Sequence, residues 1–236
     1  MKDRRKSRKA GRVMQIKGKK AVCISASNMA DSGKQSISYR ICELIRKILD
    51  KDQVICTILD LREYELIPCN GCGQCYEGGE CGRDRDFNHV YEMLTQADWC
   101  FIVSPHYAPV PAKLCMLLEK MEQITFLRWW KDESYHSKLY GKLAGIISHG
   151  GGEKWAMDSY KAMVNDTIAN ALDTVQMKVV PFNSKWDTGI ALSVKNVRKE
   201  DGIFPVQEYD WEMIEESLYN YVEVVVQTAR SLYALK

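Results

Sequence analysis

The sequence has no hydrophobic run that approaches the roughly 18 consecutive apolar residues of a membrane-spanning helix. Its charged N-terminal residues are not followed by the apolar stretch of a secretory signal. It also has no G-x-G-x-x-G motif, and Lys34 is followed by Gln35 where a nucleotide P-loop would have Ser or Thr. We therefore expect a cytoplasmic protein without a membrane partner and without a separate Rossmann-type domain.

Basic residues are concentrated in the first 20 positions, which hold ten Lys or Arg and one acidic residue. The other 216 residues carry 33 − 10 = 23 basic and 31 − 1 = 30 acidic side chains, a net charge of −7. A segment this polar cannot bury enough apolar surface to fold alone. We expect residues 1–18 to form a flexible basic arm, and residues 19–236 to form one domain. A binding module that uses this arm on nucleic acid is an alternative, although we do not expect a nucleic-acid partner.

Strand-like and helix-like segments alternate after the arm, which is typical of a parallel sheet covered by helices on both faces. The predicted strands are residues 20–27, 53–61, 98–105, 141–152 and 174–182. The predicted helices are residues 36–50, 86–96, 111–127, 154–172 and 210–235. Five such strands suit a flavodoxin-like, doubly wound α/β fold with strand order 2-1-3-4-5, in which ligands bind beyond the carboxyl ends of the strands.

Small polar residues and glycines follow three of the predicted strands. Backbone N–H groups at the start of a helix bind phosphate, and rigid loops with aromatic side chains can bind a planar ring. Each loop alone could also be ordinary turn chemistry, but three at one sheet edge favour a ligand site. The candidate residues are Ser25, Ser27, Gly33, Gln35 and Ser36 in the first loop, Ser104, Pro105, His106 and Tyr107 in the second, and Ser148, His149, Gly150 and Gly151 in the third.

Four of the nine cysteines lie together, in the loop of residues 68–85 that follows the second predicted strand. Cysteine clusters in a reducing compartment indicate metal or redox chemistry. Cys69, Cys72 and Cys75, separated by two residues each, suit an iron–sulfur cluster, with Cys81, Cys100 or Cys115 as the fourth ligand. A zinc site and unligated thiols are the alternatives, although zinc usually takes two separated C-x2-C pairs.

The order of these motifs between Lys20 and Pro181 resembles the iron–sulfur flavoprotein family, within the flavodoxin-like NAD(P)H-dependent FMN reductases. The motifs are "SASNMADSGKQS", "SPHY" followed by "AKLCMLLEKM", "SHGGG" and the spacing C-x2-C-x2-C-x5-C. The resemblance implies FMN at the sheet edge and a 4Fe-4S cluster on Cys69, Cys72, Cys75 and Cys81. One departure is that "SAS" replaces the usual Gly-Ser-Pro of the first loop.

The resemblance further implies an oxidoreductase that moves electrons among FMN, the cluster and an external partner. It implies a homodimer or homotetramer, a ferredoxin-type protein as one electron donor, and NAD(P)H as another. The aromatic segment with Trp129 and Trp130 could shield the flavin or form a subunit contact. The enzymatic alternative is an NAD(P)H-dependent reductase of flavin or quinone-type acceptors whose cysteines are structural.

Overall fold

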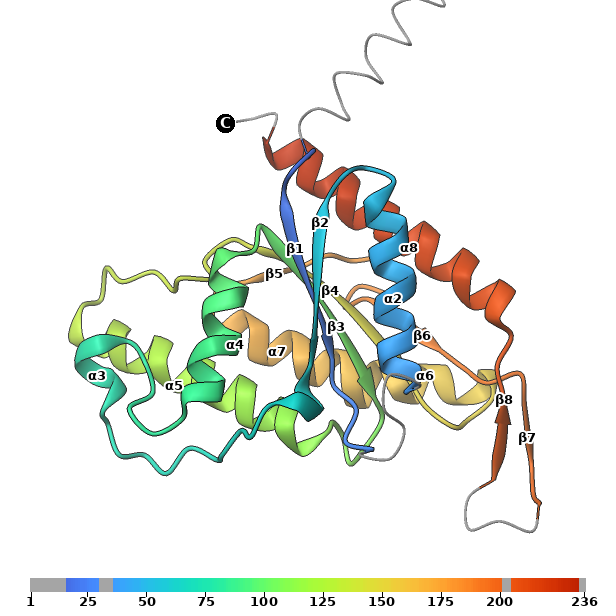
Figure 1. The fold of residues 1–236 in the computed structure, drawn as a ribbon, viewed down its shortest axis with the longest axis horizontal. Coiled ribbons are helices and arrows are strands. Elements are labelled where there is room, and N and C mark those ends of the chain that lie inside the picture. Colours follow the sequence, from blue (N-terminus) through green and yellow to red (C-terminus); the bar gives the residue numbers. More distant parts are fainter. Residues whose placement is uncertain (1–15, 30–35, 201–204, 234–236) are drawn as a thin grey trace, which may run out of the picture.

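The computed structural model describes residues 16–29, 36–200 and 205–233, and shows a central parallel sheet between two layers of helices (Figure 1). The main path of the sheet has the order β2-β1-β3-β4-β5, with every pair parallel. This confirms the predicted flavodoxin-like order. The strands of the main sheet are β1 (Lys20–Ser25), β2 (Ile55–Asp60), β3 (Trp99–Pro105), β4 (Leu143–His149), β5 (Lys178–Val179) and β6 (Ile190–Leu192).

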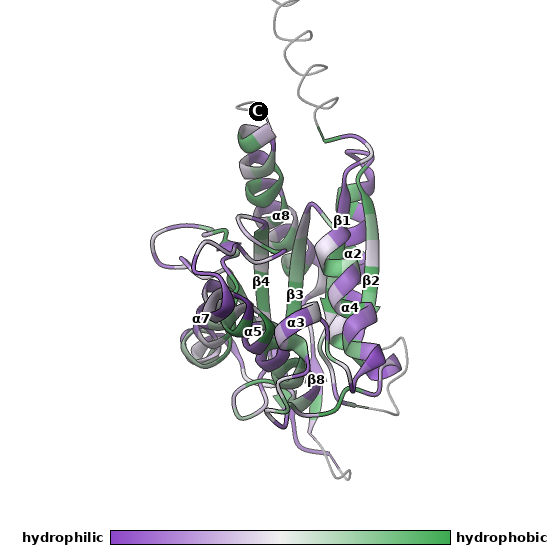
Figure 2. Ribbon diagram, turned by 90° about the vertical axis from the view of Figure 1, so that its left-hand side faces the viewer, coloured by the Kyte–Doolittle hydropathy of each residue, from purple (hydrophilic) through white to green (hydrophobic). Residues whose placement is uncertain are grey.

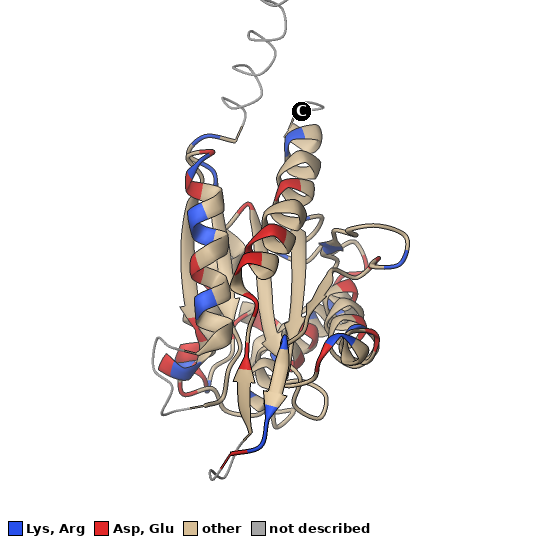
Figure 3. Ribbon diagram, turned by 90° about the vertical axis from the view of Figure 1, so that its right-hand side faces the viewer, with Lys and Arg blue, Asp and Glu red and all other residues tan. Residues whose placement is uncertain are grey.

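The helices lie on both faces of the sheet, and each face has its own apolar core. On one face α4 (Arg85–Gln96), α5 (Ala112–Lys131) and α7 (Asp166–Thr174) pack on strand residues such as Ile24 and Ile102. On the other, α2 (Ile37–Asp50) and α8 (Trp211–Tyr233) pack on alternate residues such as Cys23 and Phe101. Successive strand side chains point to opposite faces, so a strand buried on both faces is apolar throughout. Figures 2 and 3 show mostly hydrophobic central strands and charged residues on the helices that cover them.

The sheet edge beside β4 is formed by two short strands, where a single strand was predicted over residues 174–182. Two short strands share it, because β5 pairs with Leu143 and Ala144 whereas β6 pairs with residues 147–149. Gly189, which precedes β6, has φ 116°, a backbone conformation that favours glycine. The side-chain amide of Asn165 donates to the carbonyl of Ile190 at 3.1 Å. These features fix β6 next to the carboxyl half of β4.

The segment predicted as one helix over residues 154–172 is divided into four helical pieces. They are η3 (Lys154–Ala156), α6 (Met157–Tyr160), the π-helical segment η4 (Lys161–Asn165) and α7. A π-helical turn rotates the residues before it relative to those after it. Tyr160 is thereby directed to the sheet edge, while Val164 and Ile168 stay in the core.

Four elements besides β6 fall outside the predicted pattern. A short 3₁₀ helix η2 (Leu61–Glu63) follows β2, and α3 (Cys75–Gly78) lies within the cysteine loop. The strands β7 (Asn196–Arg198) and β8 (Val206–Glu208) pair antiparallel as a hairpin, which extends from the sheet next to α6 (Figure 1).

The predicted basic arm of residues 1–18 lies largely outside the described residues. Its last three residues are described, and Ile16 is fully buried against the core that α2 and α8 cover. The Gly18 N–H donates to the carbonyl of Gln53 at 2.9 Å. Ile16 therefore belongs to the core, although it lies within the predicted arm. Among the described residues, none of the helices combines the length and the apolar character that a membrane span requires.

Candidate functional site

The carboxyl ends of β1, β3 and β4 bring the three candidate loops to one edge of the sheet. Ser104 is paired in register with Ser148, and Pro105 with His149. The amide of Ala26 donates to the carbonyl of Val103 at 3.0 Å, and that of His106 donates to the carbonyl of His149 at 2.8 Å. These bonds continue the strand pairing into the loops and fix their first residues.

A cavity of about 210 Å³ opens between these loops, and eight of the predicted site residues line it. The predicted residues in its lining are Ser27, Ser36, Pro105, His106, Tyr107, His149, Gly150 and Gly151. Ser25, Ser104 and Ser148 are fully buried at the strand ends and do not line it. Gly33 and Gln35 lie outside the described residues. We call this cavity the sheet-edge pocket.

The start of α2 faces this pocket with its backbone donors. Ser36 is the N-cap, and its hydroxyl accepts the amide hydrogen of Tyr39 at 3.1 Å. The Ser27 hydroxyl accepts the amide hydrogen of Met29 at 3.3 Å. A helix N-terminus with small hydroxyl side chains suits a phosphate group.

His149 forms part of the pocket wall and is uncharged at neutral pH. Its Nε2 lies 2.8 Å from the Ser38 hydroxyl, and burial lowers the pKa of His149 from 6.5 to about 4. Three other polar atoms at this edge are buried without a hydrogen-bond partner in the described structure: His106 Nε2, Ser25 Oγ and Ser148 Oγ. Buried polar atoms normally have a partner. Of these three residues only His106 lines the pocket, so a bound ligand would supply the partner of its Nε2.

The glycine loop after β4 is shaped by Tyr160 from α6. The Gly152 amide donates to the Tyr160 hydroxyl at 2.6 Å, and the Tyr160 ring centroid lies 5.5 Å from that of His106. A Cβ on Gly150 would lie 2.5 Å from the Tyr160 ring. Only glycine fits here without displacing the ring, because the backbone at Gly150 lies directly against Tyr160.

Five lining residues were not among those predicted: Met29, Ile37, Ser38, Gln207 and Tyr209. Met29 lies within the predicted first loop but was not among its candidate residues, and Ile37 and Ser38 follow that loop directly. Gln207 and Tyr209 come from the hairpin strand β8 and the residue that follows it. No pattern in the sequence connects them with this edge.

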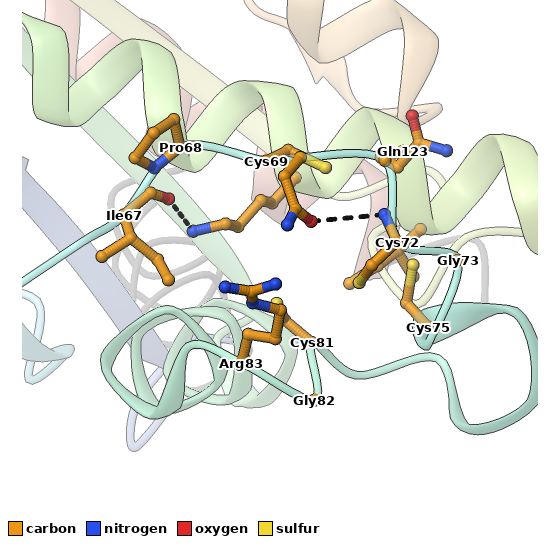
Figure 4. Close-up of a pocket in the computed structure, with 14 residues that line it drawn as sticks. Ile67, Pro68, Cys69, Cys72, Gly73, Cys75, Cys81, Gly82, Arg83 and Gln123 are labelled. Atoms are coloured by element: carbon orange, nitrogen blue, oxygen red, sulfur yellow. Dashed lines mark hydrogen bonds between the residues drawn. The ribbon is translucent and has the colours of Figure 1, made fainter.

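The cysteine loop forms a second cavity, of about 260 Å³, next to the middle of α5 (Figure 4). Gly71 and Gly73 have φ of 69° and 72°, so the backbone reverses between the cysteines in conformations that favour glycine. Cys72 is exposed, and the other three are partly buried. The cysteines that line the cavity are Cys69, Cys72, Cys75 and Cys81.

The two ends of the cysteine loop are fastened together by a buried ion pair. Lys120 and Asp84 are 3% and 4% exposed, and the Lys120 ammonium donates to the Asp84 carboxylate and to the Ile67 carbonyl. Asp84 also accepts the amide hydrogens of Ile67 at 3.0 Å and Phe87 at 2.9 Å. Burial by itself would raise the pKa of Asp84, but the Lys120 ammonium and these two amides outweigh it and lower the pKa.

Further hydrogen bonds fix the backbone at individual cysteines. The Asn88 side chain accepts from the Cys81 amide and donates to the Cys81 carbonyl, both at 2.8 Å. The Cys69 amide donates to the Glu119 carboxylate at 3.1 Å. The loop is therefore held by side chains of α4 and α5 as well as by its own turns.

The four thiols lie around the cavity and do not meet at one point. Burial raises the pKa of Cys75, and the nearby thiols Cys69, Cys81 and Cys72 raise it further. Among the described residues, no three Cys, His, Asp or Glu side chains converge closely enough to hold a single metal ion. Of the other candidate ligands, Cys100 is buried in β3 and Cys115 is exposed on α5, and neither lines this cavity.

An exposed aromatic group lies beyond this cavity at the end of α5. The rings of Phe126, Trp129 and Trp130 are 50%, 42% and 68% exposed, and their centroids lie within 6.5 Å of one another. Arg128, between them, donates to the Glu77 carbonyl of α3 at 2.5 Å. The aromatic group is thus joined to the cysteine loop.

Two proteins similar to this chain are named iron–sulfur flavoproteins. Over 115 residues the chain is 26% identical to an iron–sulfur flavoprotein of Methanocaldococcus jannaschii, covering 47% of this chain and 57% of that protein. Over 96 residues it is 28% identical to an iron–sulfur flavoprotein of Methanosarcina thermophila, covering 40% and 48%. The chain thus matches about half the length of each of these relatives.

Solved structures share the fold at low sequence identity. RosB, with a bound 8-demethyl-8-formylriboflavin-5′-phosphate intermediate, has a TM-score of 0.62 at 16% identity, covering 91% of this chain and 80% of RosB. The NADH:FMN oxidoreductase EmoB has a TM-score of 0.54 at 11% identity, covering 89% of each chain. The sequence model of the NADPH-dependent FMN reductase family matches residues 20–187 of this chain. This chain therefore belongs to the NADPH-dependent FMN reductase family, a family of flavin-dependent oxidoreductases.

Proposed function

We propose that this protein binds FMN in the sheet-edge pocket and a 4Fe-4S cluster in the cysteine loop, and passes electrons between a donor and an acceptor. One observation carries the proposal beyond the family. Four thiols surround one cavity, on a loop whose ends and cysteine amides are held by buried or paired side chains. A loop with only a structural role does not require four thiols around an open cavity.

The residues of the sheet-edge pocket fit FMN. The N-terminus of α2 with Ser27 and Ser36 would hold the phosphate, and the unpartnered His106 Nε2 would gain a partner. Gly150 and Gly151 line the pocket together with Tyr107, so the planar ring would lie against these residues. Flavin, when bound, exchanges electrons singly or in pairs. His149, which is hydrogen-bonded to Ser38, is uncharged at neutral pH and therefore adds no positive charge to the pocket wall.

The residues of the cysteine loop fit a cluster of several irons. A 4Fe-4S cluster takes one thiolate on each iron, so its ligands stand around a cavity and do not converge. Cys69, Cys72, Cys75 and Cys81 have this arrangement, with glycines between them that allow tight turns. A one-electron centre would allow the flavin to exchange electrons with a ferredoxin-type protein in the cytoplasm, and NAD(P)H would be a two-electron donor.

We also propose that the functional unit is a homodimer or homotetramer. The sheet-edge pocket and the cysteine cavity have no lining residue in common. In the proposed assembly the cysteine loop of one subunit approaches the flavin of another. The exposed group of Phe126, Trp129 and Trp130 beside that loop is an apolar surface suited to a subunit contact.

The proposal is tested by replacing a ligand and a matched cysteine. Cys75→Ala should lower iron and acid-labile sulfide sharply in anaerobically purified protein and leave the FMN content unchanged. Cys115→Ala, on the same side of the sheet but outside the cavity, should change neither. Stopped-flow reduction by a reduced ferredoxin should be slower in Cys75→Ala. If the wild type contains no iron, the cluster is refuted, and equal reduction rates would refute the relay.

The second candidate is an NAD(P)H-dependent reductase of flavin or quinone-type acceptors in which the cysteine loop is structural. The family match over residues 20–187 favours it, because that match concerns the FMN reductase domain. It predicts that Cys75→Ala retains full NAD(P)H-dependent reduction of a quinone.

A further inference from the structure

The segment after the family match returns to the sheet-edge pocket. The match ends at residue 187, yet Gln207 and Tyr209 line the pocket together with residues of the three loops. The hairpin that carries Gln207 is attached to the glycine loop, because the Val194 amide donates to the Gly152 carbonyl at 3.1 Å. The Lys195 amide donates to the Glu208 carbonyl at 2.7 Å and closes the base of the hairpin. The position of Gln207 is thus fixed relative to Gly151.

The side-chain amide of Gln207 lies directly over the backbone of Gly151. A Cβ on Gly151 would stand 2.5 Å from Gln207 Nε2, so the amide occupies the space in which another residue would carry its side chain. An amide nitrogen is a donor with two hydrogens. Gln207 therefore presents a hydrogen-bond donor at the rim of the pocket.

Tyr209 fixes which end of the Gln207 side chain faces the pocket. Its hydroxyl donates to Gln207 Oε1 at 2.8 Å, which leaves Nε2 as the group turned to Gly151. Burial raises the pKa of Tyr209 to about 12, so the hydroxyl keeps its proton and remains a donor. The ring packs against Trp211 at 5.5 Å between centroids, and the Arg40 guanidinium lies 3.4 Å from the centre of the Trp211 ring. Tyr209 is therefore anchored to α8 and α2 and is not free to turn away.

We infer that Gln207 is a specificity-determining residue of the sheet-edge pocket: its side-chain amide donates a hydrogen bond to a carbonyl oxygen of a planar ligand, and Tyr209 is the positioning residue that orients it. This inference rests on the proposed binding of FMN. Two ligands offer such an oxygen, namely the pyrimidine ring of FMN and a quinone-type acceptor bound beside it. Both have the same chemistry, a ring carbonyl without a positive charge.

The test compares the wild type, Gln207→Leu, Tyr209→Phe and the control Val206→Thr in the full chain. Val206 is the neighbouring residue of β8, is 38% exposed and does not line the pocket. FMN affinity is measured by the quenching of flavin fluorescence on titration. Acceptor binding is measured by stopped flow, as the dependence on benzoquinone concentration of the reoxidation of dithionite-reduced protein.

Loss of one neutral hydrogen bond should weaken binding roughly 2- to 10-fold. If FMN supplies the carbonyl, Gln207→Leu raises the Kd for FMN by that factor. If the acceptor supplies it, the Kd for FMN is unchanged and the half-saturating benzoquinone concentration rises instead. Tyr209→Phe should shift the same quantity in the same direction by a smaller factor, and Val206→Thr should shift neither. Either pattern supports the inference.

A double variant separates a direct role of Gln207 from a general change in the hairpin. Gly151→Ala should push the amide out of position and reproduce the effect of Gln207→Leu. Adding Gly151→Ala to Gln207→Leu should then cause less further loss than it causes alone. If wild type binds FMN and neither constant moves in Gln207→Leu, the inference is refuted and the proposed function stands. If the wild type does not bind FMN, both are refuted.

Discussion

Replacing Lys120 by methionine tests whether the buried ion pair holds the cysteine loop. Methionine retains the apolar stem but removes the ammonium that bonds Asp84 and the Ile67 carbonyl. Breaking a buried pair by removing one partner costs about 3–5 kcal/mol, because the other charge stays buried without compensation. Asp84 retains the amides of Ile67 and Phe87, so we expect the lower end, about 3 kcal/mol. The melting temperature should fall by about 6–12 °C.

The assay is equilibrium unfolding in urea at pH 7, with a chelator and a reductant present so that metal occupancy does not contribute. Lys131→Met is the matched control on α5, since its pair with Glu77 is exposed and should be worth under about 1 kcal/mol. Lys120→Met with Asp84→Asn should recover part of the loss, because the unpaired buried charge is removed while the side-chain amide oxygen still accepts one of the two backbone N–H bonds. A loss below about 1 kcal/mol in Lys120→Met, or no recovery in the double variant, would refute the reasoning.

The pH dependence of the same pair has a definite sign. In the wild type the lowered pKa of Asp84 stabilises the fold above its ordinary value of 3.8, and this contribution is lost as the pH falls through the lowered value. Without Lys120, only the two backbone amides offset the effect of burial, so the pKa of Asp84 is higher in the variant than in the wild type. The difference in unfolding free energy between wild type and Lys120→Met should therefore be largest at pH 7 and smaller at pH 4.

Two further predictions concern the sheet-edge pocket. The double variant Ser27→Glu, Ser36→Glu places negative charge where the phosphate is proposed to bind, so FMN should be lost on gel filtration while iron is retained. Equal flavin content in the variant and the wild type would show that the phosphate binds elsewhere. Burial lowers the pKa of His149 from 6.5 to about 4, which favours the neutral imidazole in the folded state. The shift corresponds to about 3 kcal/mol of unfolding free energy, which is present above pH 6.5 and is lost as the pH falls from 6.5 to 4. Urea unfolding at pH 7 and pH 4.5 measures this loss of unfolding free energy, which should be smaller in His149→Gln than in the wild type. An equal loss in the two proteins would contradict the assignment of a neutral, buried imidazole.

The sheet and its site-bearing edge could be predicted because their signals are local. The segments of β3 and β4 are apolar up to their carboxyl ends, where Ser104, Ser148 and His149 lie, and both strands are buried along their whole length. Five strands alternating with helices suit the order 2-1-3-4-5, which makes β3 and β4 neighbours and places Pro105 beside His149. The cysteine spacing is likewise local, and all four cysteines line one cavity.

The rest depends on contacts between residues far apart in sequence. Lys120 belongs to an amphipathic helix, where a lysine is typical of the exposed face, and its partner Asp84 precedes it by 36 residues. Gln207 lies in a strand of three exposed residues, too short to show a period. Ile16 follows a strongly basic segment but is fully buried. Each of these positions is determined by tertiary packing, which overrides the local pattern.

Helix α5 sets the spacing of the two proposed redox sites within one chain. It begins at Ala112, just after the loop that holds His106 and Tyr107, and its residues Lys120 and Ile124 line the cysteine cavity. At 1.5 Å per residue, these two positions lie about 12 and 18 Å along the helix axis from its start. A packed helix is rigid, so the chain cannot shorten this separation by a loop movement. In the proposed assembly a second copy of the chain brings its cysteine loop to the flavin, so we expect the relay to depend on the oligomer. Disrupting the assembly through Trp130→Glu should slow ferredoxin-dependent reduction as much as Cys75→Ala does, while leaving iron and FMN in place. Loss of oligomers on gel filtration with an unchanged reduction rate would show that one chain suffices.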